Sequence, residues 1–435
     1  MLTARRRPVA IAAALLSGAL LLTACGGDSD GGSGDGKTLK LWHYETADSA
    51  MGIAWNEAVK EFKAKHPGVK VEFEEKGFEQ IQKTAPMVLN SSDAPDVMEY
   101  NKGNATAGLL SKQGLLTDLS GEVTKRGWDK KLSAGVATTA RYDTNGVMGT
   151  GAWYGVPNYA EYAMVYVNKD LFEKYGVPVP KPSATMAELT AAMDAFARKG
   201  VTPLADGGAE YPAQQYLYQL ALSKADRSWV DGYQLYKGKV DFHDAAWTYA
   251  ADTFADWVKK GYLSDKSSST KAEDAGLSFI QGKSPLFFSG SWWYGRFKSE
   301  NKFDWDTLLW PGSKLTLGSS GNLWVVPKGA ENKELAYDFI DITMSKKVQN
   351  LLGNSGGIPV AADASALTDP RAKRLIGDFT TVSGRDGLAF YPDWPVPGFY
   401  DVLVSETQKL ITGSAKPDAV LSALQSAYDK GAPKK

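Results

Sequence analysis

From Thr38 onward, short stretches of alternating apolar residues take turns with longer stretches in which apolar residues recur every three to four positions. The first spacing is typical of strands and the second of amphipathic helices. Trp55, Val59 and Phe62, for example, share one helical face, and Pro67 ends that pattern. Up to residue 100, the patterns predict strands over 39–44, 69–73 and 94–100 and helices over 55–62 and 81–89. This order predicts an α/β fold of mostly parallel sheets flanked by helices.

The rest of the chain repeats this alternation. Thr185 and Glu188 have the spacing of a capping box at the start of a helix that ends near Gly200. Further patterns predict strands over 163–167 and 286–289 and helices over 247–261, 335–342 and within 397–430. Because the body has about 400 residues, two α/β lobes fit it better than one large sheet.

Composition narrows the classes of function. The 49 basic and 50 acidic residues give a formal net charge of -1, which supplies no field to attract nucleic acid or an anionic membrane. Three histidines and one cysteine are too few for a Cys/His zinc site, an iron–sulfur cluster or a disulfide framework. An oxygen-ligand metal site stays open, but no motif marks one, so we expect no metal or other cofactor. The 13 tryptophans and 20 tyrosines can line a wet binding surface as well as fill a core.

The first 37 residues predict export and attachment rather than fold. Arginines at 5–7 precede an apolar run over 9–22, which is short for a membrane span but suits a secretory signal. The run ends in LTAC at 22–25, which resembles the lipobox of bacterial lipoproteins and implies a signal peptide over 1–24 and lipidation of Cys25. An ordinary signal peptide is the alternative. Residues 26–36 hold no apolar side chain, so 25–37 is predicted to be a lipidated, flexible linker.

Several segments of the body carry a family resemblance. They are FKAKHPGVKV at 62–71, APDV at 94–97, GLLTDL at 114–119, YGVP at 154–157, VYVNKDLF at 165–172, GK at 282–283, FSGSW at 288–292, NKELA at 332–336 and FI at 339–340. In this order and spacing they closely resemble the extracellular solute-binding proteins of the maltose-binding type (family 1), the receptors of sugar-importing ABC transporters. The resemblance implies a two-lobe periplasmic-binding-protein-like fold of class II with a hinged cleft between the lobes.

The same resemblance implies where the lobes lie and what they do. It places crossings between the lobes near Pro157, near Gly290 and within 345–356. Lobe 1 is then expected to comprise 38–157 plus 292–345, and lobe 2 to comprise 158–291 plus 346–435. The implied function is capture of a mono- or oligosaccharide and its delivery to ABC permease subunits, with no catalytic step. The protein is expected to be a monomer, lipid-anchored to the outer face of the bacterial cytoplasmic membrane, with no nucleic-acid partner.

A sugar site needs aromatic rings for the C–H faces and planar polar groups for the hydroxyls. In open α/β sheets such a site lies beyond the carboxyl ends of the strands. The candidate ligand-binding residues at the expected strand ends and crossovers are Tyr44, Glu45, Tyr100, Asn101, Glu161, Glu210, Tyr211, Trp292, Trp293, Asn322, Asp393 and Trp394. Trp292 is the strongest stacking candidate, whereas Trp293 is favoured as a core residue. Structural roles stay open for Glu45, Glu210 and Trp394.

The ligand and the class of protein both have alternatives. NKGN at 101–104 lacks the Asp-Arg pair of maltose receptors, so the sugar is not identified. The same receptor fold could bind a polyamine, whose site would place several carboxylates between aromatic rings. An exported glycoside hydrolase would need two carboxylates about 5 to 9.5 Å apart. Glu45, Glu161 and Glu210 could imitate such a pair, but no segment resembles a hydrolase motif.

Overall fold

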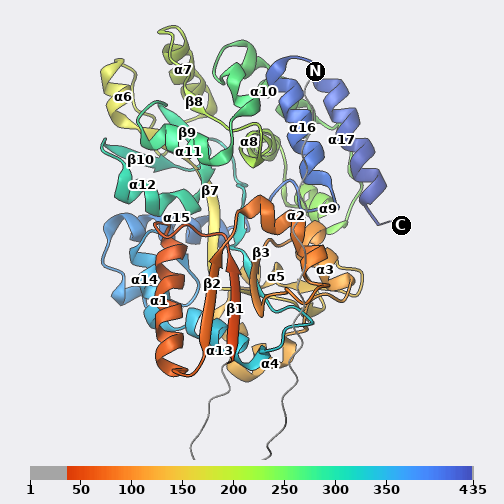
Figure 1. Cartoon of the computed structure of the whole chain (residues 1–435). Helices are drawn as coiled ribbons and strands as arrows, with labels where there is room; N and C mark the ends of the chain where they lie inside the picture. The colour runs from red at the N-terminus through yellow and green to blue at the C-terminus, as the bar shows by residue number, and fades with distance from the viewer. Residues whose placement is uncertain (1–36, 434–435) are drawn as a thin grey trace, which may run out of the picture. The chain divides into compact units, whose positions relative to one another are not determined.

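The computed structural model describes residues 37–433, which form two mixed sheets and one small two-stranded sheet. The first sheet has the order β2 (Lys70–Glu75), β1 (Thr38–His43), β3 (Val97–Tyr100), β12 (Leu323–Val325) and β6 (Val156–Pro157). The second has β7 (Tyr159–Asn168) paired with β9 (Leu286–Gly290), β10 (Trp305–Leu308), β11 (Gly318–Ser320) and β13 (Ile358–Pro359), and β8 (Leu204–Ala205) beside β9. Strands β4 (Arg141–Tyr142) and β5 (Ala152–Trp153) pair with each other. Figure 1 shows the first sheet in the lower part of the view and most of the second in the upper part.

Helices cover both faces of the first sheet. Leu41 and Trp324 point toward α1 (Ala50–Lys65), α13 (Lys333–Thr343) and α14 (Lys346–Asn354), whereas Met98 and Leu323 point to the opposite face. Period-two alternation along the strands produces these two apolar faces. The other helical segments of this region are α2 (Phe78–Val88), η1 (Asn104–Gly108), α3 (Leu109–Lys112), α4 (Ser120–Arg126), η2 (Asp129–Lys131) and α5 (Ala134–Thr138).

The second sheet is also covered on both faces. Along β7, Val165 and Val167 belong to one core cluster, and Tyr162 and Tyr166 to another. The segments around it are α6 (Lys169–Lys174), α7 (Met186–Ala197), α8 (Tyr211–Leu222), α9 (Arg227–Leu235), α10 (Ala245–Lys259), η3 (Asp265–Ser269), α11 (Ala272–Ile280), η4 (Ser291–Trp293), α12 (Tyr294–Glu300), η5 (Ala364–Ala366), α15 (Pro370–Gly384), α16 (Phe399–Thr412) and α17 (Pro417–Gly431). Each sheet with its helices forms one lobe.

Two motif segments that lie far apart in the sequence meet at the edge of the first lobe. Asp96 is 4% exposed, and its carboxylate accepts hydrogen bonds from the backbone N–H of Lys40 at 3.0 Å and of Asn332 at 2.8 Å. The amide of Asn332 in turn donates to the carbonyl of Thr38 at 3.0 Å. Asp96 therefore ties the start of α13 to the first strand.

The predicted elements and the α/β class are confirmed, including the capping box in which Thr185 and Glu188 bond each other's backbone. The predicted predominance of parallel pairing is not found. Strand β1 is parallel to β2 and β3, and β8 to β9, but β7 and β12 are antiparallel to their neighbours. These two strands enter directly from the other sheet, without the crossover helix that makes neighbouring strands parallel.

The chain passes between the sheets from β6 to β7, from β11 to β12, and after α14. The family resemblance predicts the first crossing near Pro157 and the third within 345–356. The second differs, since β9, β10 and β11 all pair with β7, so the chain crosses near Gly321 and not near Gly290. Strands β10 and β11 accordingly belong to the second sheet, although the family resemblance implies that 292–345 lies in lobe 1.

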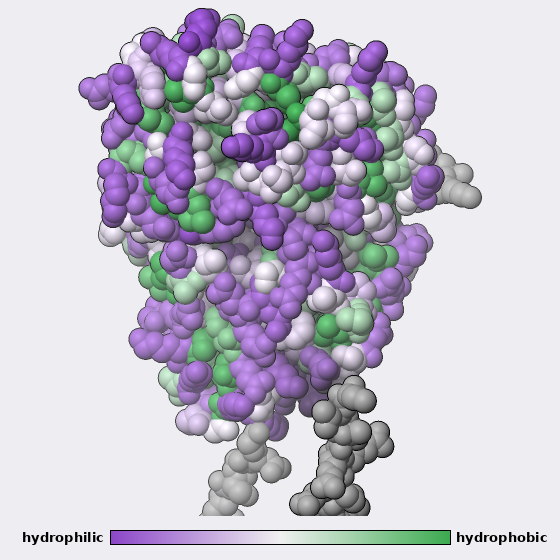
Figure 2. All heavy atoms as spheres, turned by 45° about the horizontal axis from the view of Figure 1, so that its top comes forward, coloured by the Kyte–Doolittle hydropathy of each residue, from purple (hydrophilic) through white to green (hydrophobic). Residues whose placement is uncertain are grey.

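The surface seen in Figure 2 is dominated by hydrophilic residues, with hydrophobic ones scattered among them. Ile53, Met87 and Val179 are the large apolar side chains that are exposed within 37–433. No helix in this described part is both long and apolar enough to cross a membrane. The predicted signal peptide, Cys25 and most of the linker lie outside the described residues.

Candidate functional site

A buried ion pair joins the two sheets. Lys102 follows β3 of the first sheet, and its Nζ lies 2.6 Å from Oε1 of Glu161 on β7 of the second. The two side chains are only 3% and 5% exposed. The same ammonium donates to Oδ1 of Asn322 at 3.0 Å, and the Asn322 amide donates to the hydroxyl of Tyr159 at 2.9 Å. The network therefore links the end of β3 to the first and second crossings.

Two more carboxylates lie beside this ion pair. Glu45 accepts hydrogen bonds from Ser49 Oγ at 3.2 Å and from the Tyr159 hydroxyl at 3.5 Å. Burial, reinforced by the charge of Glu161, raises the pKa of Glu45 to about 7. Glu99 is fully buried, and neither of its carboxylate oxygens has a well-formed hydrogen bond to any described residue. Burial and then the charge of Glu45 raise the pKa of Glu99 well above its ordinary 4.5.

Aromatic rings from both lobes form a continuous band along this polar cluster. The Trp292 ring meets Tyr211 edge to face at 5.9 Å and lies tilted against Tyr391 at 6.2 Å. Tyr211 contacts Phe78 of the first lobe at 6.3 Å, and Phe78 contacts Tyr44 at 5.3 Å. The hydroxyls of Tyr44 and Tyr391 and the indole Nε1 of Trp292 are buried without a well-formed hydrogen bond within the described chain. Most buried polar atoms in proteins have a hydrogen-bond partner, so these three atoms require an explanation.

Direct contacts hold the lobes together around this band. The backbone N–H of Ala105 donates to the carbonyl of Trp394 at 2.8 Å, and the Asn104 amide donates to the carbonyl of Gln234 at 2.9 Å. Arg296 of α12 lies 3.4 Å from Asp48, and the Tyr400 hydroxyl bonds Glu79. The two lobes are therefore in direct contact on several sides of the band.

The structure gathers some of the predicted site residues in this cleft. Tyr44, Glu45, Glu161, Tyr211, Trp292 and Asn322 take part in the polar cluster or the aromatic band. Asn101 lies beside them, and its side chain accepts from the backbone N–H of Lys102 at 3.0 Å. Asp393 precedes Trp394, and burial raises its pKa to about 6. Their roles as ligand contacts stay predictions.

The other predicted residues are engaged in structure. The carboxylate of Glu210 accepts from the backbone N–H of Ala272 at 2.8 Å, which holds the start of α11. Trp293 stacks on Phe297 at 5.4 Å in the core. Tyr100 is 3% exposed and belongs to a core cluster. Trp394 is 1% exposed, and a Cβ at Gly103 would lie 2.6 Å from its ring.

Sequence reasoning missed four members of the site. Lys102, Glu99, Tyr159 and Tyr391 were not among the candidates, although all lie in the cluster or the band. Glu99 and Lys102 flank the candidates Tyr100 and Asn101, which lie at the end of a predicted strand. The same strand-end position could therefore have indicated Glu99 and Lys102. Nothing local to Tyr159 or Tyr391 indicates that a distant segment brings it to the cleft.

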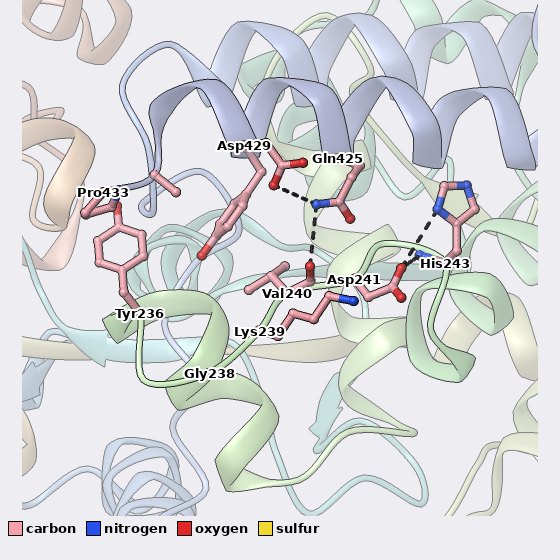
Figure 3. A pocket seen from close by; sticks show the side chains of 11 residues that line it. Tyr236, Gly238, Lys239, Val240, Asp241, His243, Gln425, Asp429 and Pro433 are labelled. Carbon is pink, nitrogen blue, oxygen red and sulfur yellow. Dashed lines mark hydrogen bonds and ion pairs between the residues drawn. The ribbon is translucent and has the colours of Figure 1, made fainter. Parts of the chain in front are cut away.

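A separate surface hollow is shown in Figure 3, between the loop after α9 and helix α17. Its lining includes Tyr236, Asp241, His243, Gln425 and Asp429. Within it, the Gln425 amide donates to Asp429 at 2.8 Å. The lining comes from the second lobe alone, so a ligand there would not contact both lobes. We therefore place the candidate site at the cleft.

The fold is that of a two-lobe protein whose lobes meet at this polar cluster and aromatic band. The chain belongs to the bacterial extracellular solute-binding protein family, whose model matches residues 57–375. This is a family of ligand-binding proteins.

Known relatives and structures agree with this assignment. A probable sugar-binding periplasmic protein of Rhizobium meliloti is 26% identical over 266 residues, which cover 60% of this chain and 59% of that protein. This chain thus spans less than two thirds of that relative's length. The diacetylchitobiose binding protein of Streptomyces coelicolor is 26% identical over 374 residues, 80% of each chain. The structure of a chitin oligosaccharide binding protein matches 91% of this chain and 99% of its own, with a TM-score of 0.77 and 21% identity. This likeness shows the shared two-lobe fold.

Proposed function

We propose that the protein captures a carbohydrate, a mono- or oligosaccharide, between its lobes and delivers it to the permease subunits of an ABC importer. The observation that carries this proposal is the band of aromatic rings from both lobes beside buried carboxylate, amide and hydroxyl groups. Sugars present apolar C–H faces and a rim of hydroxyls, so this pairing of rings and planar polar groups matches both parts. Trp292 is the proposed stacking residue, because its ring joins the band while its Nε1–H makes no well-formed hydrogen bond to any described residue.

The arrangement of the lobes suits transport. Only short crossing segments connect the sheets, and the contacts between the lobes include hydrogen bonds, ion pairs and aromatic contacts such as that of Phe78 with Tyr211. A ligand that touches both lobes stabilises the closed arrangement by its differential affinity. The permease can then recognise the ligand-bound protein because its lobes are closed. We propose no bond-breaking step, since Glu161 and Glu210 are already engaged by Lys102 and by the backbone of Ala272.

The names of relatives support a sugar as the ligand. Besides the Rhizobium and Streptomyces proteins, a maltooligosaccharide ABC transporter solute-binding lipoprotein of Streptococcus pneumoniae is 25% identical over 379 residues, covering 82% of this chain and 81% of that protein. By analogy with that lipoprotein we propose export, lipidation at Cys25 and anchoring to the outer face of the cytoplasmic membrane. We also propose that the protein acts as a monomer with the two lobes divided at the three crossings.

The test is a thermal-shift assay of the chain from Thr38 onward against mono- and oligosaccharides, polyamines and amino acids, with intrinsic tryptophan fluorescence as a second readout. A ligand that binds only the folded form stabilises it by mass action, and this raises the melting temperature. At a ligand concentration of a hundred times Kd, the free energy of unfolding rises by about 2.7 kcal/mol. We expect a shift with a saccharide, and loss of that shift in Trp292→Ala.

Tyr249→Ala is the matched control. Tyr249 is a half-buried aromatic residue on α10 that contacts Lys224 instead of the cleft, so its removal should leave the ligand-induced shift intact. Shifts with polyamines alone would refute the carbohydrate ligand. Turnover of a glycoside would refute the receptor function.

A further inference from the structure

We infer that the cleft selects a saccharide that carries a basic nitrogen, an amino sugar, whose ammonium group binds beside the carboxylates of Glu45 and Glu99. The inference rests on the proposed function and names the class of its ligand. It starts from an imbalance of charge, because three buried carboxylates, Glu45, Glu99 and Glu161, lie around the single ammonium of Lys102 in this cluster.

The groups that face Glu45 and Glu99 do not correct this imbalance. The start of α1 offers the neutral hydroxyl of Ser49, and β7 offers the neutral hydroxyl of Tyr159 together with the charge of Glu161. The backbone N–H of Tyr44 also faces Glu99, and the Tyr44 hydroxyl is buried near it without a well-formed hydrogen bond to any described residue. Buried carboxylates in such surroundings must take up protons or gain a positive partner. The raised pKa values of Glu45 and Glu99 express that demand.

Lys102 shows how this cleft accommodates an ammonium group. Its Nζ has a carboxylate oxygen at 2.6 Å, an amide oxygen at 3.0 Å, and the ring centroids of Tyr391 and Trp394 both at 5.4 Å. Carboxylates and aromatic faces are the groups that bind organic cations. A ligand amine would find the same chemistry beside Glu99, where both acceptor oxygens lack well-formed hydrogen bonds within the described chain.

Acidic groups continue along the aromatic band. Burial raises the pKa of Glu79, with the charges of Glu210 and Asp401 adding to the effect and that of Lys83 opposing it. Burial also raises the pKa of Asp393, and the charge of Glu79, from the first lobe, raises it further. Glu79 also accepts a hydrogen bond from Tyr400 of the second lobe, so this acidic side chain lies where the two lobes meet.

The experiment compares ligands that differ at one position of the sugar ring. Cello-oligosaccharides, N-acetylchito-oligosaccharides and chitosan oligosaccharides of one to four units share their linkage and carry a hydroxyl, a neutral acetamide or an ammonium group at C2. Binding is measured by isothermal titration calorimetry at about pH 6, with spermidine as a cation that is not a sugar. We expect the ammonium series to bind at least about tenfold more tightly than the hydroxyl series.

Two variants locate the effect. Glu99→Gln keeps the shape of the side chain and removes its charge, and it should reduce the preference for the ammonium series. Glu331→Gln removes an exposed carboxylate and should leave that preference unchanged. If Glu99→Gln fails to fold, the comparison of the three series on the unaltered protein still decides the question.

The outcomes separate this inference from the proposed function. Equal or tighter binding of the hydroxyl or acetamide series would overturn the inference while the carbohydrate receptor stands. Binding of spermidine without any saccharide would overturn both. A lack of binding by every probe would overturn the inference as well, because the single-unit ligands test the amine without regard to linkage.

Discussion

Removing the ammonium of Lys102 should destabilise the protein far more than removing the charge of its partner. In Lys102→Met, Glu161 stays buried beside Glu45 with no positive neighbour in the cluster. Breaking a buried pair in this way costs about 3–5 kcal/mol. In Glu161→Gln, Lys102 keeps the Asn322 oxygen and gains a better balance with the remaining carboxylates, so we expect a cost of about 1 kcal/mol.

The assay is a double-mutant cycle measured by urea unfolding, followed by tryptophan fluorescence and far-UV circular dichroism. The double variant should recover part of the loss in Lys102→Met, and the coupling energy should exceed about 1.5 kcal/mol. The control cycle uses Lys260 and Asp256, an exposed pair 2.8 Å apart at the end of α10, for which about 0.3–0.5 kcal/mol is expected.

The Lys102→Met variant could lose less stability than expected if its lobes opened, because water would then solvate Glu161. Small-angle X-ray scattering recorded in parallel would show that opening as a larger radius of gyration. The reasoning would be refuted if the two single variants lost equal stability, the coupling stayed below about 0.5 kcal/mol, and the radius of gyration did not change.

Three further predictions follow from single contacts. Asp96→Ala should lower the free energy of unfolding by about 2–4 kcal/mol, since two backbone N–H groups lose their acceptor, and a loss under about 1 kcal/mol in urea unfolding would contradict this. The raised pKa of Glu45 means that the folded state binds this proton more tightly than the unfolded state does. The free energy of unfolding should therefore fall as pH rises from about 4.5 to about 7. If the melting temperatures of wild type and Glu45→Gln changed in parallel with pH, this prediction would be wrong. Gly103→Ala should lower the melting temperature, because φ is 110° there and the new Cβ would meet the Trp394 ring, and an unchanged melting temperature would count against it.

Elements defined by local patterns were predictable from the sequence. The capping box of Thr185 and Glu188 and the alternation along β7 depend on residues that are neighbours in the chain. The family segments added the two-lobe architecture, which periodicity alone does not give. Asp96 and Asn332 show why such segments carry information, because these residues are 236 positions apart and their hydrogen bond joins the start of α13 to the sheet.

Pairing direction and the second crossing were not predictable in the same way. Strand β10 pairs with β7 through Trp305 and Asn168, and no local pattern specifies such a partner. The motif at 288–292 resembles a strand after which the chain crosses to the other lobe. The next two strands, β10 and β11, nevertheless pair with β7 of the same lobe. A strand's periodicity reports which of its faces are buried, and it carries no information about which neighbour covers its edge.

The site shows the same division between local and distant causes. Trp292 and Trp293 are adjacent in a short 3-10 turn, so they point to different sides, one toward Tyr211 and the other into the core against Phe297. That separation follows from local geometry. Lys102 is different, because a lysine after a strand is normally solvated and is buried only when distant segments supply its partners. A buried lysine surrounded by more carboxylates than it can neutralise is therefore a property of the assembled protein, and our inference about the charge of the ligand rests on this property.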